Sequence, residues 1–231
     1  MNQRAERTIA RETDEMLAGV IFDMDGVVVD SHPAHMLAWK MLLEELGKNL
    51  SESDLDFVLD GHRREEILRH YLGELTADQV KEYGSRKDAL YREAAQELKT
   101  IRGLEEFMNQ LAAAGIAMAV ASSAGRQRVE QTLEKLRLAK RFRAVVTGDD
   151  VVKHKPDPAV FLMAAQEMGV RAESILVCED AAVGVIAAKS AGMKCLGIAV
   201  EGREAQLRQA GADRVVRDFR EVRLEEVSGM F

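Results

Sequence analysis

Short apolar runs alternate with segments of helical periodicity along most of the chain. The first run, residues 17–22, is uninterrupted and ends abruptly in Asp23 and Asp25. Further short apolar runs occupy residues 116–121, 144–146, 175–178, 195–200 and 215–216. Continuous apolar runs are typical of strands that are buried on both faces, as they are in parallel sheets. Because helical segments separate these runs, the pattern predicts an α/β fold with a doubly wound parallel sheet.

A different pattern occupies residues 32–99, which show helical periods and no convincing strand. Apolar positions predict a first helix over 35–46. A longer helix begins at the capping box of Thr76 and Gln79, and its apolar stripe runs to Leu98. Shorter helices are expected after residues 51–54 and over residues 65–72. We interpret this stretch as an all-helical cap domain inserted after the first strand. The predicted parts are a sheet domain of residues 17–31 and 100–231, a cap domain of residues 32–99, and a flexible N-terminal tail of residues 1–16.

Composition narrows the class of protein. The chain has 231 residues, 47% of them hydrophobic, and a formal net charge of −7 at pH 7, whereas nucleic-acid binding needs a clustered basic surface. The tail lacks the apolar core of a signal peptide, and no run reaches the roughly 18 apolar residues of a membrane span. Cys178 and Cys195 lie in apolar runs and imply no disulfide framework. We therefore expect a cytoplasmic monomer or weak dimer, without nucleic-acid or membrane partners.

Polar side chains follow several of the predicted strands at the point where each run ends. In chain order they are Asp23 and Asp25, Ser122 and Ser123, Lys155, and Glu179 and Asp180. The carboxyl ends of parallel strands meet at one edge of the sheet, where open α/β folds bind ligands. Asp23 and Asp25 share a face of an extended chain, so their like charges favour a cation or a proton between them. Magnesium suits hard oxygen ligands at such an edge, together with a substrate phosphate.

Each of these residues also has a purely structural interpretation. An Asp-x-Asp-Gly sequence can belong to a calcium loop or a turn. A serine or a carboxylate between a strand and a helix can be a helix N-cap, with Ser123 as the candidate cap and Ser122 facing the cleft. Lys155 could simply be solvated, and Lys153 competes with it for the site, although only Lys155 precedes a proline. The joint placement of these residues at successive strand ends favours a functional site.

Four of these segments resemble the motifs of the haloacid dehalogenase-like phosphatases. They are Asp23-Met-Asp25-Gly-Val, the serine at 122, Lys155-Pro-Asp-Pro, and Glu179-Asp180 with the small-residue helix that follows. The resemblance implies a Rossmann-like core with a helical cap, with Asp23 as the nucleophile that becomes an aspartyl phosphate and Asp25 as general acid/base. It implies phosphate binding by Ser122, Ser123 and Lys155. It also implies Mg²⁺ ligation by Asp23, the main-chain carbonyl of Asp25, and Asp180, with Glu179 as an inner or outer support.

The cap is similar to that of the β-phosphoglucomutase-like subfamily. By this resemblance His35 contacts the acid/base, Arg64 grips a distal phosphate, and Lys87 is the cap lysine near the hinge. His62 is a further candidate in the same cap. The alternative for Lys87 is that its stem packs while its ammonium reaches water. The core departs from the mutase pattern Ala-Ser-Lys-Asn, because this chain continues after Ser122 with Ser-Ala-Gly and then Arg126, which is one position off but could compensate for the lost lysine.

The resulting prediction is a Mg²⁺-dependent phosphatase for a small phosphorylated metabolite, with a sugar phosphate as the expected substrate. The runner-up is a sugar-phosphate mutase, which shares the first half of the reaction. A dehalogenase would leave Glu179 and Asp180 without a purpose, and a phosphonatase would need a Schiff-base lysine, for which Lys87 is the candidate. A binding protein on a retired enzyme fold remains the non-enzyme alternative. The intact Asp23, Asp25, Lys155 and Asp180 speak against that alternative.

Overall fold

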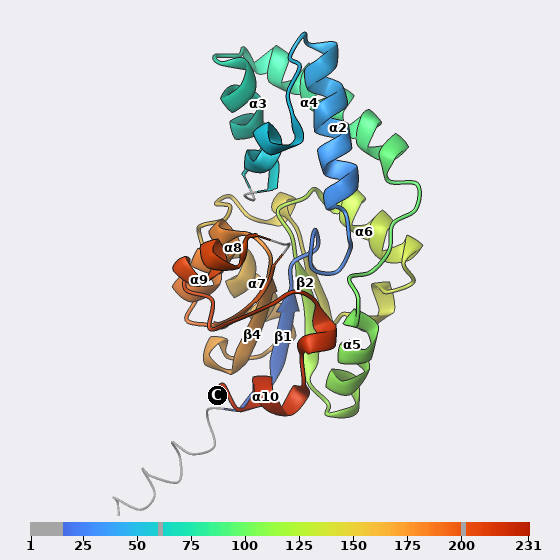
Figure 1. Ribbon diagram of the computed structural model, residues 1–231. Coiled ribbons are helices and arrows are strands. Elements are labelled where there is room, and N and C mark those ends of the chain that lie inside the picture. The colour runs from blue at the N-terminus through green and yellow to red at the C-terminus, as the bar shows by residue number, and fades with distance from the viewer. Residues whose placement is uncertain (1–15, 60–61, 200–201) are drawn as a thin grey trace, which may run out of the picture.

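A six-stranded parallel sheet forms the centre of the computed structural model, which describes residues 16–59, 62–199 and 202–231 (Figure 1). Its order is β3-β2-β1-β4-β5-β6. The strands are β1 (Gly19–Phe22), β2 (Ala117–Ala121), β3 (Ala144–Val146), β4 (Ile175–Glu179), β5 (Lys194–Ile198) and β6 (Arg214–Val216). Each adjacent pair is parallel, which confirms the predicted sheet and places β1 between β2 and β4. Residues 1–15 of the predicted tail lie outside the described residues.

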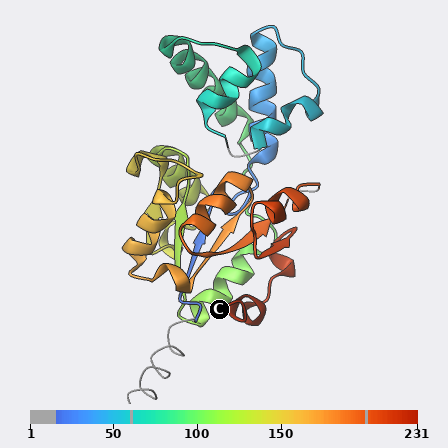
Figure 2. The ribbon, with the colours of Figure 1, turned by 90° about the vertical axis from the view of Figure 1, so that its left-hand side faces the viewer.

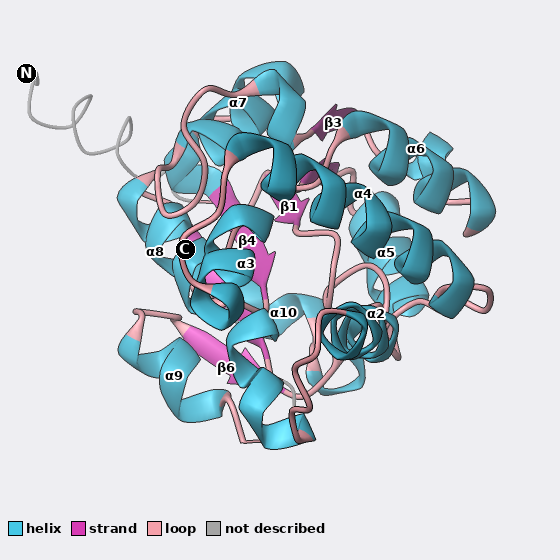
Figure 3. Cartoon of the chain, turned by 90° about the horizontal axis from the view of Figure 1, so that it is seen from above, coloured by secondary structure: helices cyan, strands magenta, loops and turns pink. Residues whose placement is uncertain are grey.

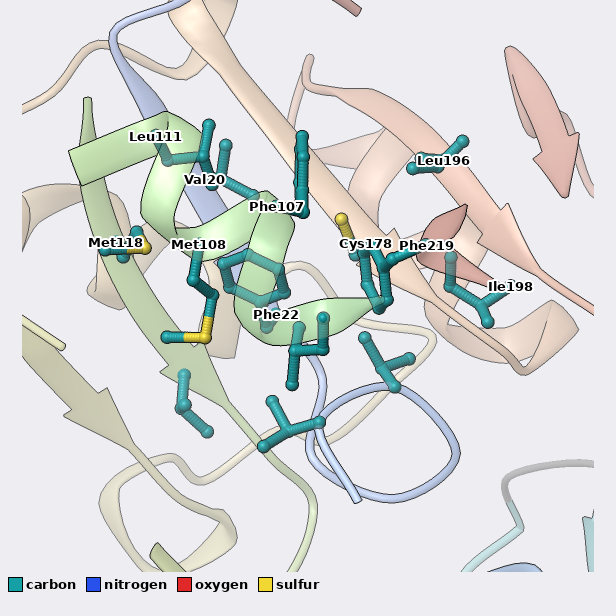
Figure 4. Packing of buried hydrophobic residues seen from close by; sticks show 14 of the residues in the cluster. Val20, Phe22, Phe107, Met108, Leu111, Met118, Cys178, Leu196, Ile198 and Phe219 are labelled. Atoms are coloured by element: carbon teal, nitrogen blue, oxygen red, sulfur yellow. The ribbon is translucent and has the colours of Figure 1, made fainter. Parts of the chain in front are cut away.

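Helices cover both faces of the sheet, as the view from above shows (Figure 3). One face packs against α5 (Leu104–Ala113), α6 (Arg126–Lys135) and α10 (Leu224–Ser228), and the other against α7 (Ala159–Met168), α8 (Ala182–Ser190) and α9 (Glu204–Gln209). Side chains along β1 alternate between the two cores, because Val20 and Phe22 belong to the first and Ile21 to the second. Phe22 is fully buried in an aromatic group with Phe107 and Phe219, whose ring centroids lie 6.3 and 6.0 Å away (Figure 4).

The cap is a separate helical layer with its own core, at one end of the sheet (Figure 2). It consists of α2 (His32–Glu45), the 3₁₀ helix η1 (Glu52–Leu59), α3 (Arg64–Leu72) and α4 (Ala77–Ala94). The capping box predicted for α4 is present, since Thr76 and Gln79 exchange side-chain-to-backbone hydrogen bonds. The α-helix expected after residue 51 is instead the 3₁₀ helix η1, and no described helix is long and apolar enough to cross a membrane.

The chain passes between the sheet domain and the cap twice, near residues 30 and 99, and these two segments lie side by side. Asp30 N–H donates to the carbonyl of Lys99 at 2.9 Å, and Val29 forms an isolated bridge with Thr100. The apolar stripe assigned to the longer helix extends to Leu98, yet α4 ends at Ala94 because the chain must turn back towards this junction. Leu98 still packs against both the cap core and the sheet core. The domain boundaries at 31/32 and 99/100 remain predictions.

Candidate active site

The carboxyl edge of the central strands faces the cap across one cleft of about 1150 Å³. Asp23 follows β1, Ser122 follows β2, and Glu179 ends β4. Register explains why they meet, because Phe22 pairs with Val120 on one side and with Cys178 on the other. Asp23, Ser122 and Glu179 each follow these paired residues by one or two positions along the chain. The predicted convergence at one sheet edge is therefore present.

Lys155 lies between two buried carboxylates. Its Nζ is 2.5 Å from Asp23 Oδ1, and it also contacts Glu179 Oε1. Burial opposes the charge of this lysine, but Asp23 and Glu179 outweigh it and raise the pKa of Lys155. Burial likewise raises the pKa of Asp23, with Glu179 and Asp25 adding to the effect and Lys155 opposing it. Lys153, the competing lysine, is 77% exposed and pairs with Asp157.

Both carboxylate oxygens of Glu179 already have hydrogen-bond partners. Oε1 contacts Lys155, and Oε2 accepts the backbone N–H groups of Asp180 and Ala181 at 2.9 and 3.0 Å. A carboxylate with these partners has little capacity left for a metal ion. Of the two roles that the sequence left open for Glu179, the outer one fits this geometry, and the inner one does not.

Gly184 leaves the space that Glu179 occupies. A Cβ on Gly184, in the first turn of α8, would overlap the Glu179 carboxyl group. Gly184→Ala should therefore destabilise the protein by about 1–3 kcal/mol, as overpacking does, although alanine normally stabilises a helix interior by about 1 kcal/mol relative to glycine. Urea denaturation measures the effect.

Gly84→Ala in α4 is the matched control for this substitution. There an added Cβ meets only the flexible end of the Arg64 side chain, which can move aside. We expect this variant to be neutral or more stable than the parent. A Gly184→Ala protein as stable as the Gly84→Ala protein would contradict the tight placement of Glu179.

Asp25 points towards Ser31, which directly precedes α2, and towards the cap. Its Oδ1 accepts from Ser31 Oγ at 2.7 Å and lies 3.3 Å from His35 Nε2. Arg128 of α6 binds both oxygens, with distances of 2.9 Å to Oδ1 and 2.5 Å to Oδ2. Burial favours the neutral acid, but the charge of Arg128 and the hydrogen bonds from His35 and Arg128 prevail and hold the pKa of Asp25 well below its usual range.

The predicted cap residues His35 and Lys87 form a chain that ends at Asp25. Lys87 Nζ lies 2.8 Å from His35 Nδ1, and the amine sits over the rings of Trp39 and Tyr91. Lys87 is 6% exposed and lines the cleft, so its ammonium does not reach bulk water as the alternative required. Burial, reinforced by Arg128, lowers the pKa of Lys87 to about 7. Burial and then Lys87 lower the pKa of His35 to about 4, which favours a neutral ring that donates from Nε2 to Asp25.

Asp180 is bound by a residue that the sequence did not single out. His32, at the start of α2, places Nε2 2.7 Å from Asp180 Oδ2. Gly26, with φ of +74°, makes room for this pair, since a Cβ there would overlap both side chains. Only the tertiary fold brings His32 to Asp180, and no local sequence signal indicates it.

The donor set at this edge fits Mg²⁺ in its chemistry. Asp23 and Asp180 are buried oxygen donors that line one cleft, and each has a pKa raised by burial. Asp23 also raises the pKa of Asp180, so the two charges repel each other. Across the described ranges, no three acidic, histidine or cysteine side chains are already clustered as a complete ligand set. This is compatible with Mg²⁺, which commonly uses one or two carboxylates together with water and substrate phosphate.

The two predicted phosphate-binding serines both line the cleft, but neither caps α6. Ser122 is buried and its Oγ accepts the Ala124 N–H at 3.1 Å, while Ser123 is exposed. The N-cap is Gly125, so the assignment of the cap to Ser123 is wrong. The reason is that the chain makes a further turn at 122–124 before the helix begins.

Arg126 does not compensate for the missing lysine. It binds Asp150 at 2.6 Å and Glu130 at 3.1 Å, outside the cleft. Arg128, two residues later, is the arginine of this helix that reaches the site, and it was missed. Its sequence signal was a polar stripe of Arg128, Thr132 and Lys135 beside the apolar stripe of α6.

Arg64 and His62 belong to the cap side of the same cleft. Arg64 is 46% exposed and forms a two-point ion pair with Asp88 at 2.8 and 2.9 Å. His62 stacks on Phe57 with a centroid distance of 3.9 Å. Both side chains are placed to meet a ligand, but they contact neither Asp23 nor Lys155.

Comparison with known proteins agrees with this geometry. Residues 20–198 match the family model described as haloacid dehalogenase-like hydrolase. The chain is 32% identical over 218 residues to a β-phosphoglucomutase of Bacillus subtilis, covering 90% of this chain and 93% of that protein. It is 33% identical over 180 residues to a phosphorylated carbohydrates phosphatase of Thermotoga maritima, covering 77% and 83%.

A solved structure extends the agreement to the fold. A HAD hydrolase of family IA, variant 3, from Entamoeba histolytica superposes with a TM-score of 0.83 at 28% identity and covers 92% of this chain and 98% of its own. The sequence and structure matches therefore cover most of the chain. They include the parallel sheet, the helical cap and the residues at the edge of the sheet. The chain belongs to the haloacid dehalogenase-like hydrolases and is an enzyme.

Proposed function

We propose that this enzyme is a Mg²⁺-dependent phosphatase that acts on a small phosphorylated metabolite, with a sugar phosphate as the expected substrate. The observation that carries the proposal is the buried contact of Lys155 with Asp23 at the carboxyl end of β1. A carboxylate held beside a fixed cation is suited to attack an anionic phosphoryl group. The curated relatives described above include a carbohydrate phosphatase, which supports this substrate class.

The proposed reaction uses the residues of the chain in two steps. Asp23 attacks phosphorus in line and forms an aspartyl phosphate, while Asp25 protonates the leaving oxygen. Water then attacks phosphorus with Asp25 as the base, the bond from phosphorus to Asp23 breaks, and inorganic phosphate leaves while Asp23 is regenerated. Lys155 stabilises the negative charge of the phosphoryl group throughout, and Ser122 and Ser123 are expected to bind its oxygens.

A metal ion completes this proposal. Asp23, the main-chain carbonyl of Asp25, and Asp180 would hold Mg²⁺, which neutralises phosphate charge when it is bound. His32 must then share or release the Oδ2 atom of Asp180 that it now binds. The free, buried Cys178 and Cys195 are compatible with the cytoplasmic location that we propose for the enzyme.

A sugar-phosphate mutase is the second candidate. The observation that favours it is the buried chain from Lys87 through His35 to Asp25, which links the acid/base to the cap. Cap closure in a mutase excludes water, so that a sugar hydroxyl accepts the phosphoryl group instead. The Bacillus subtilis relative is named a β-phosphoglucomutase.

Phosphate release from a panel of sugar phosphates, with Mg²⁺ or with EDTA, tests the proposal. We expect Mg²⁺-dependent release from at least one sugar phosphate and at least a tenfold loss of rate after chelation, restored by added Mg²⁺. Interconversion of β-glucose 1-phosphate and glucose 6-phosphate, primed with a bisphosphate and without phosphate release, would favour the mutase. Equal rates with Mg²⁺ and EDTA would contradict the metal requirement.

A further inference from the structure

Arg128 links the core to both the acid/base and the cap. Its guanidinium binds the two oxygens of Asp25, lies 3.3 Å from His35 Nε2, and is 5.5 Å from the ring centre of Tyr91 in α4. The same helix α6 also binds the chain directly after α4, because Lys135 Nζ donates to the carbonyls of Ala95 and Gln96. The position of Arg128 relative to the cap is therefore fixed at two points.

The carboxylate of Asp25 is held in place by neighbours from the core and the cap. Four donor contacts surround its carboxylate, one from Ser31, one from His35 and two from Arg128. Three of these contacts fall on Oδ1 and one falls on Oδ2, and Arg128 is the neighbour that binds both oxygens. The carboxylate must therefore leave the fork of Arg128 before it can swing towards the leaving group of a substrate.

Opening the fork leaves a site for another anion. Arg128 would lose its carboxylate partner, and the buried amine of Lys87 lies close enough for the charge of Arg128 to help lower its pKa. The buried hydroxyl of Tyr91 lies near Arg128 and Ser31 but, among the residues that the structure describes, it has no hydrogen-bond partner. Unpaired cations and hydroxyls away from water are costly. A planar or tetrahedral oxyanion would accept hydrogen bonds from Arg128 and Tyr91 and would carry negative charge beside Lys87.

We propose that Arg128 is a specificity-determining residue, which releases Asp25 in exchange for an anionic group on the leaving part of the substrate. The proposal rests on the proposed phosphatase function and narrows its substrates to phosphoesters with a second anionic group, either a phosphate or a carboxylate. Such a group replaces one two-point contact of arginine with another of the same geometry. A neutral leaving alcohol breaks the contact without replacing it, so it is a poorer substrate.

Equilibrium binding tests the exchange without turnover. The probes are two pairs that differ in one anionic group: fructose 1,6-bisphosphate with fructose 1-phosphate, and 2-phosphoglycolate with ethyl phosphate. Titrations use the Asp23→Asn protein and follow the fluorescence of Trp39, the single tryptophan, which lies beneath Lys87. We expect tighter binding of the doubly anionic member in at least one pair. Adding Arg128→Met should lower the affinity for this doubly anionic ligand at least tenfold more than the affinity for the singly anionic ligand of the same pair.

Arg126→Met is the matched control, since this arginine lies on the same helix and points out of the cleft. It should leave the preference unchanged, whereas Arg128→Lys should retain part of it because the charge remains and the fork is lost. An equal loss for both members of a pair would indicate a merely structural arginine. No preference in either pair, or a preference that survives Arg128→Met, would also overturn the proposal.

Turnover separates this proposal from the proposed function. In the Arg128→Met protein with intact Asp23, kcat/KM for the preferred doubly anionic substrate should fall at least tenfold more than kcat/KM for p-nitrophenyl phosphate, whose leaving group needs little acid catalysis. Equal falls would contradict the exchange while leaving the phosphatase intact. A wild-type protein that releases no phosphate from any probe would contradict the phosphatase itself, and the binding preference would still report on Arg128.

Discussion

Replacing Asp23 with asparagine should reduce phosphate release by a factor on the order of 10³ or more, because the amide cannot form the acyl phosphate. The same change removes one of the two buried carboxylates that share Lys155. Since the burial of Asp23 opposes its charge, we expect the variant to be at least as stable as the parent. Steady-state phosphate release and thermal unfolding, measured on the same samples, test both expectations.

The control for this variant is Asp78→Asn, the same isosteric exchange at an exposed position in the first turn of α4. It should leave phosphate release within about twofold, as surface substitutions usually do. An Asp23→Asn protein that is folded and retains more than a tenth of the parent activity would rule out Asp23 as the nucleophile. An Asp23→Asn protein that is inactive because it is unfolded would contradict the expectation that it is at least as stable as the parent.

Replacing Lys155 with methionine should cost both stability and activity. Methionine leaves Asp23 and Glu179 buried without their cation, and breaking a buried ion pair costs about 3–5 kcal/mol. Loss of a fixed positive charge beside the reacting phosphoryl group should lower kcat by about 10²–10³-fold. Urea denaturation and phosphate release measure the two effects separately.

A second substitution shows whether Lys155→Met loses stability through unbalanced buried charge or through lost packing. Glu179→Gln keeps an oxygen for the N–H groups of Asp180 and Ala181, so the double variant with Lys155→Met removes a buried negative charge and preserves these hydrogen bonds. We expect it to recover at least about half of the lost stability and none of the activity. A double variant less stable than Lys155→Met alone would contradict the proposed charge balance.

Much of the fold was predictable because the strands are buried on both faces. Continuous apolar runs identified every strand to within about two residues, and the absence of such runs identified the helical insertion. Helix ends were less predictable, as the early end of α4 shows, because tertiary contacts at the cap junction decide where the chain turns. The segment after residue 51 is short and became a 3₁₀ helix, which local polarity does not distinguish from an α-helix.

The site was predictable where a residue follows a strand directly. Asp23, Ser122, Glu179 and Asp180 needed only the sheet to bring them together. His32 and Arg128 were missed, because they reach the site from helices whose orientation depends on the whole fold. Glu179 shows the limit of a motif, since its neighbours decide that it supports Lys155 and leave it little capacity for metal.

The most direct test of the central claim is to trap the phosphorylated enzyme. A single turnover of a sugar phosphate with Mg²⁺ is quenched in acid, and borohydride then reduces an acyl phosphate to an alcohol that peptide mass spectrometry locates. We predict conversion of Asp23 to homoserine in the parent protein and no conversion in the Asp23→Asn protein. Phosphate release without any modified Asp23, or with the modification at another carboxylate, would contradict the assignment of the nucleophile.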